Sequence, residues 1–270
     1  MKHGQRHLRL VIVGRGSMAR RVVDLLRARR SPVDLVGIGL RETEAPGAGQ
    51  SGARLLAGPG GLSALQADLV VEAASAGAVE TWGRAAFLAG AHFAPISTSA
   101  FTDDDLLARL REAAAAANRR LIIPNGAVGG IDLLRAASLL PLRRVEHVVA
   151  KPPEAWRGTA ASGYVDLDAI TGPVEFLAGS ARELAALFPQ NANATVTTSL
   201  AGIGLDRTMV RLVADPGLDR NRHTLRIEGD AGEYNVVLSN APIAGNPKTS
   251  ELTALSLVML IEDQARSATS

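Results

Sequence analysis

The first half of the chain alternates short aliphatic runs with longer segments whose apolar residues recur at helical spacing. Strands are predicted for LRLVIVG, VDLVGIGL, ADLVVEAA, AHFAPIS and RLIIPNG. Helices are predicted for residues 17–29, for AGAVETWGRAAFLAG and for TDDDLLARLREAAAAAN. In the last of these, Thr102 is the expected N-cap and Asp105 follows three residues later. Alternating β and α segments of this length are typical of a parallel, doubly wound sheet.

The pattern changes past about Asn125. A strand is predicted for RRVEHVVAK, and helices are predicted for residues 130–140, 173–187 and 192–201. Three further strand-like runs, RTMVRLVAD, RHTLRIEG and GEYNVVLS, are joined by short turns, which indicates an antiparallel sheet. The predicted fold is therefore α/β in two parts. Residues 1–124 form a Rossmann-type doubly wound parallel sheet, and residues 125–247 form an α+β domain with a mainly antiparallel sheet. A last helix, 248–266, is predicted to pack back on the first part.

The composition favours a core of small aliphatic side chains. Hydrophobic residues make up 47% of the chain and aromatic ones only 3%. This suits buried parallel strands covered by Ala-rich helices, and it suits poorly a stacking surface for single-stranded nucleic acid. The formal charge is +2 and the basic residues are scattered, so no nucleic-acid partner is predicted.

The chain has no cysteine, which excludes disulfides, thiolate metal sites and cysteine nucleophiles. No metal is predicted. The apolar run near the N-terminus is too short for a signal peptide, and the stretch LTALSLVMLI is about half the length that a bilayer span requires. A soluble cytoplasmic protein without a membrane partner is therefore expected.

The glycine loop GRGSMA follows the first predicted strand and matches the pattern G-x-G-x-x-A. Gly14 would permit the tight turn, Gly16 would let the backbone approach a pyrophosphate, and Ala19 would let the helix pack closely on the strand. Ser17 and Met18 lie in the first helical turn, whose N–H groups can bind phosphate. The loop therefore predicts a dinucleotide cofactor.

The end of the second strand leaves NAD and NADP as alternatives. An NAD site commonly carries an acidic residue there, about twenty residues beyond the glycine loop. Here the strand is followed by Arg41 and Glu42, and Asp34 lies at its other end. Arg41 could accept a 2′-phosphate, whereas solvated loop residues are the other interpretation of both charges.

One histidine, His223, lies near the start of the predicted strand NRHTLRIEG. Strand alternation places it on the apolar face with Leu225 and Ile227. A histidine in such a place is more often a packed core residue than a catalyst. The strand alone therefore does not assign chemistry to His223.

Six further segments form an ordered set, STSA, NGAVGGID, KPPEAW, FPQNANATVTTSLAG, DRNRHTLRIEGDAG and NPKTS. With the glycine loop they span most of the chain, and together they resemble the L-aspartate dehydrogenase family. The sequence departs from the family's pattern at Ala19, where glycine is more usual, and at the end of the second strand, where the usual acid is displaced. These departures bear on cofactor preference more than on the type of reaction.

The resemblance implies an enzyme that uses NAD or NADP to oxidise L-aspartate to iminoaspartate, which hydrolyses to oxaloacetate and ammonia. It also implies the reverse reductive amination, and a homodimer whose first domain binds the cofactor and whose second domain binds the substrate and dimerises. By motif position, His223 corresponds to the family's catalytic histidine, and Ala127 and Asn193 to its cofactor-contacting residues. The remaining histidines are interpreted as surface or packing residues: His3, His7, His92 and His147.

The two carboxylates of aspartate require charged or hydroxyl donors. Ser99, Lys151 and Lys248 are predicted to bind the substrate. Ser97 is predicted to contact the cofactor, because STSA follows a parallel strand at the edge where doubly wound sheets bind their ligands. Lys151 as an ion pair between domains and Lys248 as a surface charge are the alternatives. Asn193, near a helix start, is also suited to an N-cap.

Two other functions are compatible with a glycine loop in this fold. One is a related two-domain reductase, such as a dihydrodipicolinate reductase or a homoserine dehydrogenase. The other is a dinucleotide sensor without catalysis. The combination of FPQNANA with NRHTLRIEGDAG argues against the reductases, and the presence of both His223 and Asn193 argues against the sensor.

Overall fold

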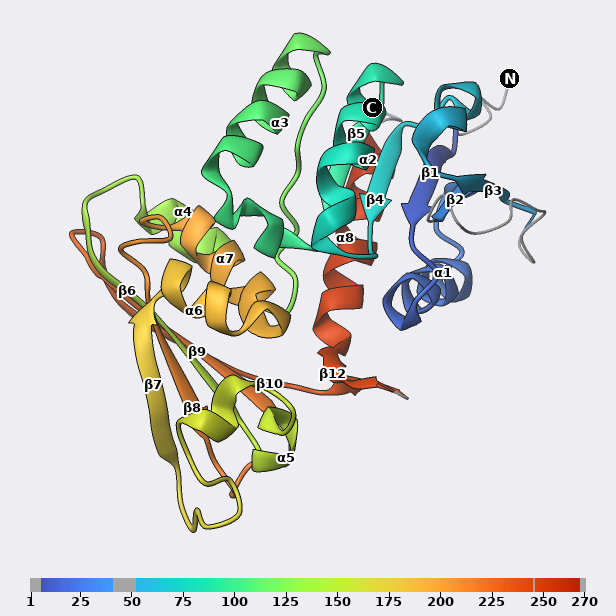
Figure 1. Ribbon diagram of the computed structural model, residues 1–270. Coiled ribbons are helices and arrows are strands. Elements are labelled where there is room, and N and C mark those ends of the chain that lie inside the picture. Colours follow the sequence, from blue (N-terminus) through green and yellow to red (C-terminus); the bar gives the residue numbers. More distant parts are fainter. Residues whose placement is uncertain (1–5, 41–51, 245, 268–270) are drawn as a thin grey trace. The chain divides into compact units, whose positions relative to one another are not determined.

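The computed structural model (Figure 1) describes three stretches of the chain, residues 6–40, 52–244 and 246–267. The chain divides into two compact units. Unit 1 comprises the residues up to Pro124 together with those from Ala254 onward, and unit 2 comprises Asn125–Thr253. Within the described stretches, no helix is long and apolar enough to cross a membrane.

Unit 1 contains a parallel sheet with the strand order β3-β2-β1-β4-β5. Its strands are β1 (Leu8–Val13), β2 (Val33–Leu40), β3 (Arg54–Ala57), β4 (Leu69–Glu72) and β5 (His92–Pro95). β1 and β4 are neighbours, so the direction in which successive strands are added reverses between them. Doubly wound sheets bind ligands at such a switch point, outside the carboxyl ends of the strands. The predicted doubly wound parallel sheet is confirmed.

Two strands of unit 1 differ from the prediction. β3 lies in the connection after β2, and its four residues, RLLA, are too few to show a strand pattern. RLIIPNG, predicted as a strand, forms only an isolated parallel bridge between Phe93 and Leu121. Pro124 has no N–H donor, so it cannot continue a ladder of hydrogen bonds there.

The long helices of unit 1 are α1 (Ser17–Arg29), α2 (Ala76–Leu88), α3 (Asp104–Ala116) and most of α8 (Glu251–Ser267). The N-cap of α3 is Asp103, whose Oδ1 accepts a hydrogen bond from the Leu106 N–H at 3.0 Å. The prediction of Thr102 as this cap is therefore wrong by one residue. α8 is bound to α1, because Glu262 accepts two hydrogen bonds from the Arg29 guanidinium.

Unit 2 contains a mixed sheet with the strand order β10-β9-β6-β8-β7. Its strands are β6 (Leu142–Lys151), β7 (Val174–Ser180), β8 (Met209–Ala214), β9 (Asn221–Gly229) and β10 (Gly232–Asn240). β6 pairs in parallel with β8, and the other pairings are antiparallel. The mainly antiparallel sheet is confirmed. The last three predicted strands are not all neighbours, however, because β6 lies between β8 and β9.

Residues 173–187 do not form the single helix that was predicted. They form β7 followed by α6 (Ala181–Leu187). Ser180 caps α6: its hydroxyl accepts from the Glu183 N–H at 3.2 Å, and the Glu183 carboxylate accepts from the Ser180 N–H at 2.8 Å. This capping box starts the helix at that point, and the residues before it are free to pair with β8.

Helices α4 (Ile131–Ala137), α6 and α7 (Ala192–Ala201) cover one face of the unit 2 sheet (Figure 1). Apolar residues of α4, α7, β6 and β9 form a core beneath them, including Ile131, Leu134, Val145, Ala201, Leu225 and Ile227. Strand alternation places His147 on the face of Val145 and His223 on the face of Leu225. Both histidines therefore lie beside an apolar core.

Candidate functional site

The glycine loop forms a tight turn between β1 and α1. Gly14 has a φ of +109°, which residues with a side chain rarely adopt. A Cβ at this position would lie 2.7 Å from the carbonyl oxygen of Ala73. The Gly14 N–H donates to the carbonyl oxygen of Gly39 at 2.8 Å, which holds the turn against β2. Only glycine fits this position without strain.

Gly16 differs from Gly14, because the protein itself does not need a glycine there. It is the N-cap of α1 with a φ of −69°, and a Cβ added to it would meet nothing within 4 Å. Open space beside the N–H groups of a helix N-terminus fits a pyrophosphate. The first turn contains Ser17 and Met18 and no acidic side chain, and Ala19 is buried, as close packing of helix and strand requires. The residues of this loop fit a dinucleotide.

Arg41, the predicted acceptor of a 2′-phosphate, lies outside the described residues, as does Glu42.

Glu72, the last residue of β4, is a buried acid at the carboxyl edge of the unit 1 sheet. It accepts hydrogen bonds of 2.7–3.1 Å from the N–H groups of Ala74 and Ser75 and from the N–H and hydroxyl of Ser97. Burial raises the pKa of Glu72, and these hydrogen bonds oppose that rise. Glu72 thus joins the loops after β4 and β5. Because the Ser97 hydroxyl donates to Glu72, it can offer a ligand only its lone pairs.

His223 on β9 is paired with a second histidine, His147 on β6. His147 Nε2 and His223 Nδ1 are 2.9 Å apart, and the ring centroids are 5.1 Å apart. On its other side, His147 Nδ1 lies 3.0 Å from the hydroxyl oxygen of Thr198 in α7. His147 is fully buried and His223 is 6% exposed. The interpretation of His147 as a surface or packing residue missed its contact with His223.

The environment lowers the pKa of both rings. Desolvation and the positive charge of Lys151 lower the pKa of His223 to about 4. Desolvation lowers the pKa of His147 well below its usual range, and the neighbouring His223 adds to this effect. Both imidazoles are therefore neutral at neutral pH, and a neutral imidazole can accept a proton.

Lys151, the last residue of β6, places a cation in the same region of unit 2. Its ammonium donates a hydrogen bond to the side-chain oxygen of Asn191 and lies 4.9 Å from the ring centre of Trp156 in α5 (Pro153–Trp156). Asn191, rather than Asn193, is the N-cap residue of α7. The carboxyl end of β6 and the start of α7 thus bring a nearly buried cation close to the neutral ring of His223.

Three further predicted residues lie in unit 2. Asn193 is in the first turn of α7, and its side chain is exposed. The carbonyl oxygen of Ala127 accepts a hydrogen bond from Asn240 Nδ2 at 2.8 Å. Lys248 lies in β12 (Asn246–Ser250), and its side chain is outside what the structure describes.

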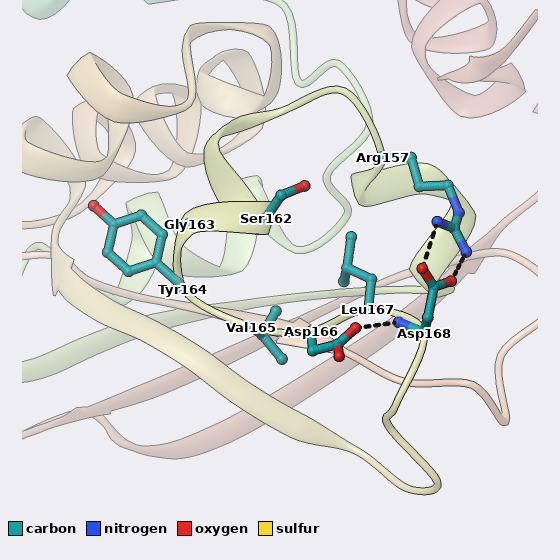
Figure 2. A pocket seen from close by; sticks show the side chains of 8 residues that line it. All are labelled: Arg157, Ser162, Gly163, Tyr164, Val165, Asp166, Leu167 and Asp168. Carbon is teal, nitrogen blue, oxygen red and sulfur yellow. Dashed lines mark hydrogen bonds and ion pairs between the residues drawn. The ribbon is translucent and has the colours of Figure 1, made fainter.

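A surface pocket lies in the segment between α5 and β7 (Figure 2). An ion pair between Arg157 and Asp168 borders one end of it, and Tyr164 lies at the other. The residues that line this pocket do not include any predicted site residue. It gives no support for a substrate site at that position.

Comparison with known proteins shows the family. Residues 132–264 match a family model described as "Aspartate dehydrogenase, C-terminal", and residues 14–124 match "Homoserine dehydrogenase, NAD binding domain". An L-aspartate dehydrogenase of Brucella anthropi is 50% identical over 256 residues, which cover 94% of this chain and 96% of that protein. The chain belongs to the aspartate dehydrogenase family.

Solved structures agree with this assignment. The crystal structure of aspartate dehydrogenase from Thermotoga maritima is similar over 98% of this chain and 97% of that chain, with a TM-score of 0.74 and 26% identity. A homoserine dehydrogenase from Thiobacillus denitrificans has a TM-score of 0.64 at 14% identity, covering 98% of this chain and 75% of that chain. The second similarity shows the fold alone. The predicted aspartate dehydrogenase family is confirmed, and its nicotinamide dinucleotide cofactor follows from the matched NAD-binding domain.

Some of the predicted residues of this aspartate dehydrogenase family member lie near one another within each unit. Unit 1 holds the glycine loop and the STSA segment, in which Ser99 is half-buried. Unit 2 holds His223 and Lys151 close together. Three residues that contact these side chains were not predicted from the sequence, namely Glu72, His147 and Asn191, and neither was Thr198, which contacts His147.

Proposed function

We propose that this protein is an NAD(P)-dependent L-aspartate dehydrogenase that uses His223 as its general base. It oxidises L-aspartate to iminoaspartate, which hydrolyses to oxaloacetate and ammonia, and it catalyses the reverse reductive amination. The observation that carries the proposal is the buried, neutral ring of His223 beside a cation, Lys151. Identity of 50% with an L-aspartate dehydrogenase, over nearly the whole chain, supports the choice of substrate.

His223 is proposed to accept the proton that the substrate ammonium loses before Cα is oxidised. Acid–base help of this kind is typically worth ~10² to 10⁴ in rate. The bound dinucleotide supplies the acceptor for the hydride that leaves Cα. Once the proton has left the site, the neutral ring can take a second one from the water that attacks the imine. Because the pKa of His223 is about 4, the ring is in its accepting form at neutral pH.

Cofactor binding is proposed for the backbone N–H groups at the start of α1, because the N–H groups of a helix N-terminus bind anions such as phosphate. The full set of proposed contacts is Gly14, Gly16, Ser17, Met18, Ala19, Arg41, Ser97, Ala127 and Asn193. Arg41 favours NADP if it holds a 2′-phosphate, and initial rates with NAD and NADP compare the two directly.

Replacing Lys151 with methionine is expected to raise the KM for L-aspartate about 10- to 100-fold, since a charge-assisted hydrogen bond is worth roughly 1.5–3 kcal/mol. The Lys151 ammonium is proposed to bind a substrate carboxylate, and methionine keeps most of the length of the side chain without its charge. The Kd of NADH is expected to stay unchanged. Steady-state kinetics measure the KM, and a fluorescence titration measures the Kd.

Lys248→Met is the variant for comparison, because Lys248 and Ser99 are the other proposed carboxylate donors. A larger rise in KM at Lys248 than at Lys151 would move the carboxylate site to the C-terminal segment. An unchanged KM in both variants would contradict any contact between a lysine and the substrate.

The proposed function is tested by following NADH and NADPH in both directions. We expect the reduced cofactor to be consumed with oxaloacetate plus ammonia and to be formed with L-aspartate. Turnover of a different carbonyl compound, with none of oxaloacetate plus ammonia, would overturn the substrate. Tight cofactor binding without turnover of any amino acid would favour a sensor. A homodimer is also proposed. Sedimentation equilibrium measures the mass in solution, which is expected to be twice that of one chain.

A further inference from the structure

We propose that Thr198 and His147 are positioning residues that fix the tautomer of His223, so that its Nε2 is bare and can accept a proton. This proposal rests on the proposed function of His223 and identifies the two side chains that set its tautomer. The three side chains form a continuous relay that begins at the carbonyl oxygen of Ala194 in α7.

The direction of the relay is set at Thr198. Its Oγ1 lies 3.0 Å from the carbonyl oxygen of Ala194 and 3.0 Å from His147 Nδ1. A carbonyl oxygen has no hydrogen to donate, so the hydrogen between the two oxygens is the hydroxyl proton of Thr198. A hydroxyl has only one proton. Thr198 therefore meets His147 as an acceptor, and the hydrogen in that contact is on His147 Nδ1.

Counting hydrogens in the same way determines the tautomers of the two imidazole rings. A neutral imidazole has one N–H, so a hydrogen on Nδ1 of His147 leaves its Nε2 as an acceptor. His147 Nε2 lies 2.9 Å from His223 Nδ1, which must therefore be the donor. The neutral ring of His223 then carries its hydrogen on Nδ1 and has a bare Nε2. His147 is fully buried, whereas His223 is 6% exposed, so His223 is the ring that a substrate can reach.

A neutral hydrogen-bond partner is better suited than a charged one to orient His223 as a base. A carboxylate in the place of His147 would stabilise the imidazolium form and raise the pKa of His223. His147 orients the ring without adding negative charge, and the Lys151 cation disfavours protonation of His223. The site thus combines a fixed tautomer with a ring that stays neutral until a substrate proton arrives.

Thr198→Val and Thr198→Ser separate the hydroxyl from the shape of the side chain. Valine keeps the shape and removes the hydroxyl, so the hydrogen of His147 can move to Nε2 and force the hydrogen of His223 onto its own Nε2. We expect kcat/KM for L-aspartate to fall roughly 10- to 100-fold in Thr198→Val and to change less than about threefold in Thr198→Ser. The Kd of NADH is expected to stay the same in both.

The ¹⁵N NMR spectrum of the imidazole nitrogens reports the tautomer without any substrate, and a His223→Asn variant assigns the signals. We expect a protonated Nδ1 and a bare Nε2 on His223 in the wild-type protein and in Thr198→Ser, and the reverse in Thr198→Val. A second pair covers the case in which Thr198→Val does not fold. His147→Gln, whose amide oxygen can accept from His223 Nδ1, is expected to keep more activity than His147→Leu.

Hydrogen on Nε2 of His223 in the wild-type spectrum would overturn the inference. The same tautomer and the same rate in Thr198→Val and Thr198→Ser would also overturn it. A wild-type protein with the expected tautomer but without aspartate oxidation would instead contradict the proposed function and leave the relay standing.

Discussion

Replacing His223 with alanine is expected to lower kcat/KM for L-aspartate by ~10² to 10⁴, the usual contribution of a general acid–base group. The ring is neutral, nearly buried and hydrogen-bonded to His147, so it is in the form that can accept a proton. The proposed dinucleotide contacts do not include His223. The Kd of NADH is therefore expected to stay unchanged, and NADH fluorescence measures it alongside the kinetics.

Two controls make this result specific. His223→Asn lacks a basic nitrogen but keeps an N–H donor for His147, so it removes the base with little loss of packing. His7→Ala removes a half-exposed histidine that pairs with Asp34 in unit 1, and its rate is expected to equal that of the wild-type protein. If His223→Asn oxidised L-aspartate as fast as the wild-type protein, His223 would not be the base.

Gly14→Ala and Gly16→Ala are both expected to weaken cofactor binding, but for different reasons. Alanine at position 14 must adopt a φ of +109° with its Cβ 2.7 Å from the Ala73 carbonyl oxygen. This strain is expected to lower the free energy of unfolding by roughly 1–3 kcal/mol and to weaken cofactor binding with it. Alanine at position 16 meets nothing within 4 Å, so the stability is expected to change by less than about 0.5 kcal/mol.

Cofactor binding is where Gly16→Ala is expected to show its effect. Its methyl group takes the space proposed for the pyrophosphate, and crowding of this kind raises the Kd of NADH roughly 10- to 100-fold. Urea unfolding and NADH titration measure the two effects separately. Gly172→Ala, at another glycine with open space, is the control and is expected to change neither. Unchanged NADH binding in Gly16→Ala would place the pyrophosphate elsewhere.

The fold of unit 1 could be predicted from the sequence because its elements are marked locally. β1, β2, β4 and β5 are aliphatic runs bounded by turns, and α1 begins and ends at the predicted residues 17 and 29. β3 is four residues in a connection rich in glycine and alanine, and it has no pattern of its own. The order of the strands depends on contacts between distant segments, which the spacing of residues does not record.

Unit 2 shows where local patterns mislead. The apolar spacing of residues 173–187 fits a helix throughout, and only Ser180 and Glu183 mark the true start of α6. The central place of β6 could not be predicted either. Its pairing with β8 and β9 joins segments more than fifty residues apart, so neighbours in the sequence are not neighbours in the sheet.

The candidate site could be predicted only in part, because some of its contacts also join segments that are distant in the sequence. His223 could be placed on an apolar face by alternation, and its proposed role came from the family resemblance. His147 lies 76 residues earlier, and its contact with His223 depends on the register of β6 against β9. Its position in RRVEHVVAK does place it on the face of Val145. Two histidines on the apolar faces of two predicted strands were thus a signal that the sequence offered.

The protonation state of His223 can be measured directly by following its imidazole resonances from neutral to acid pH. We expect a midpoint of about 4, because desolvation and the Lys151 charge both disfavour the imidazolium. Lys151→Met is expected to raise that midpoint. A midpoint near the ordinary value of about 6.5 would contradict a desolvated, neutral base at this position.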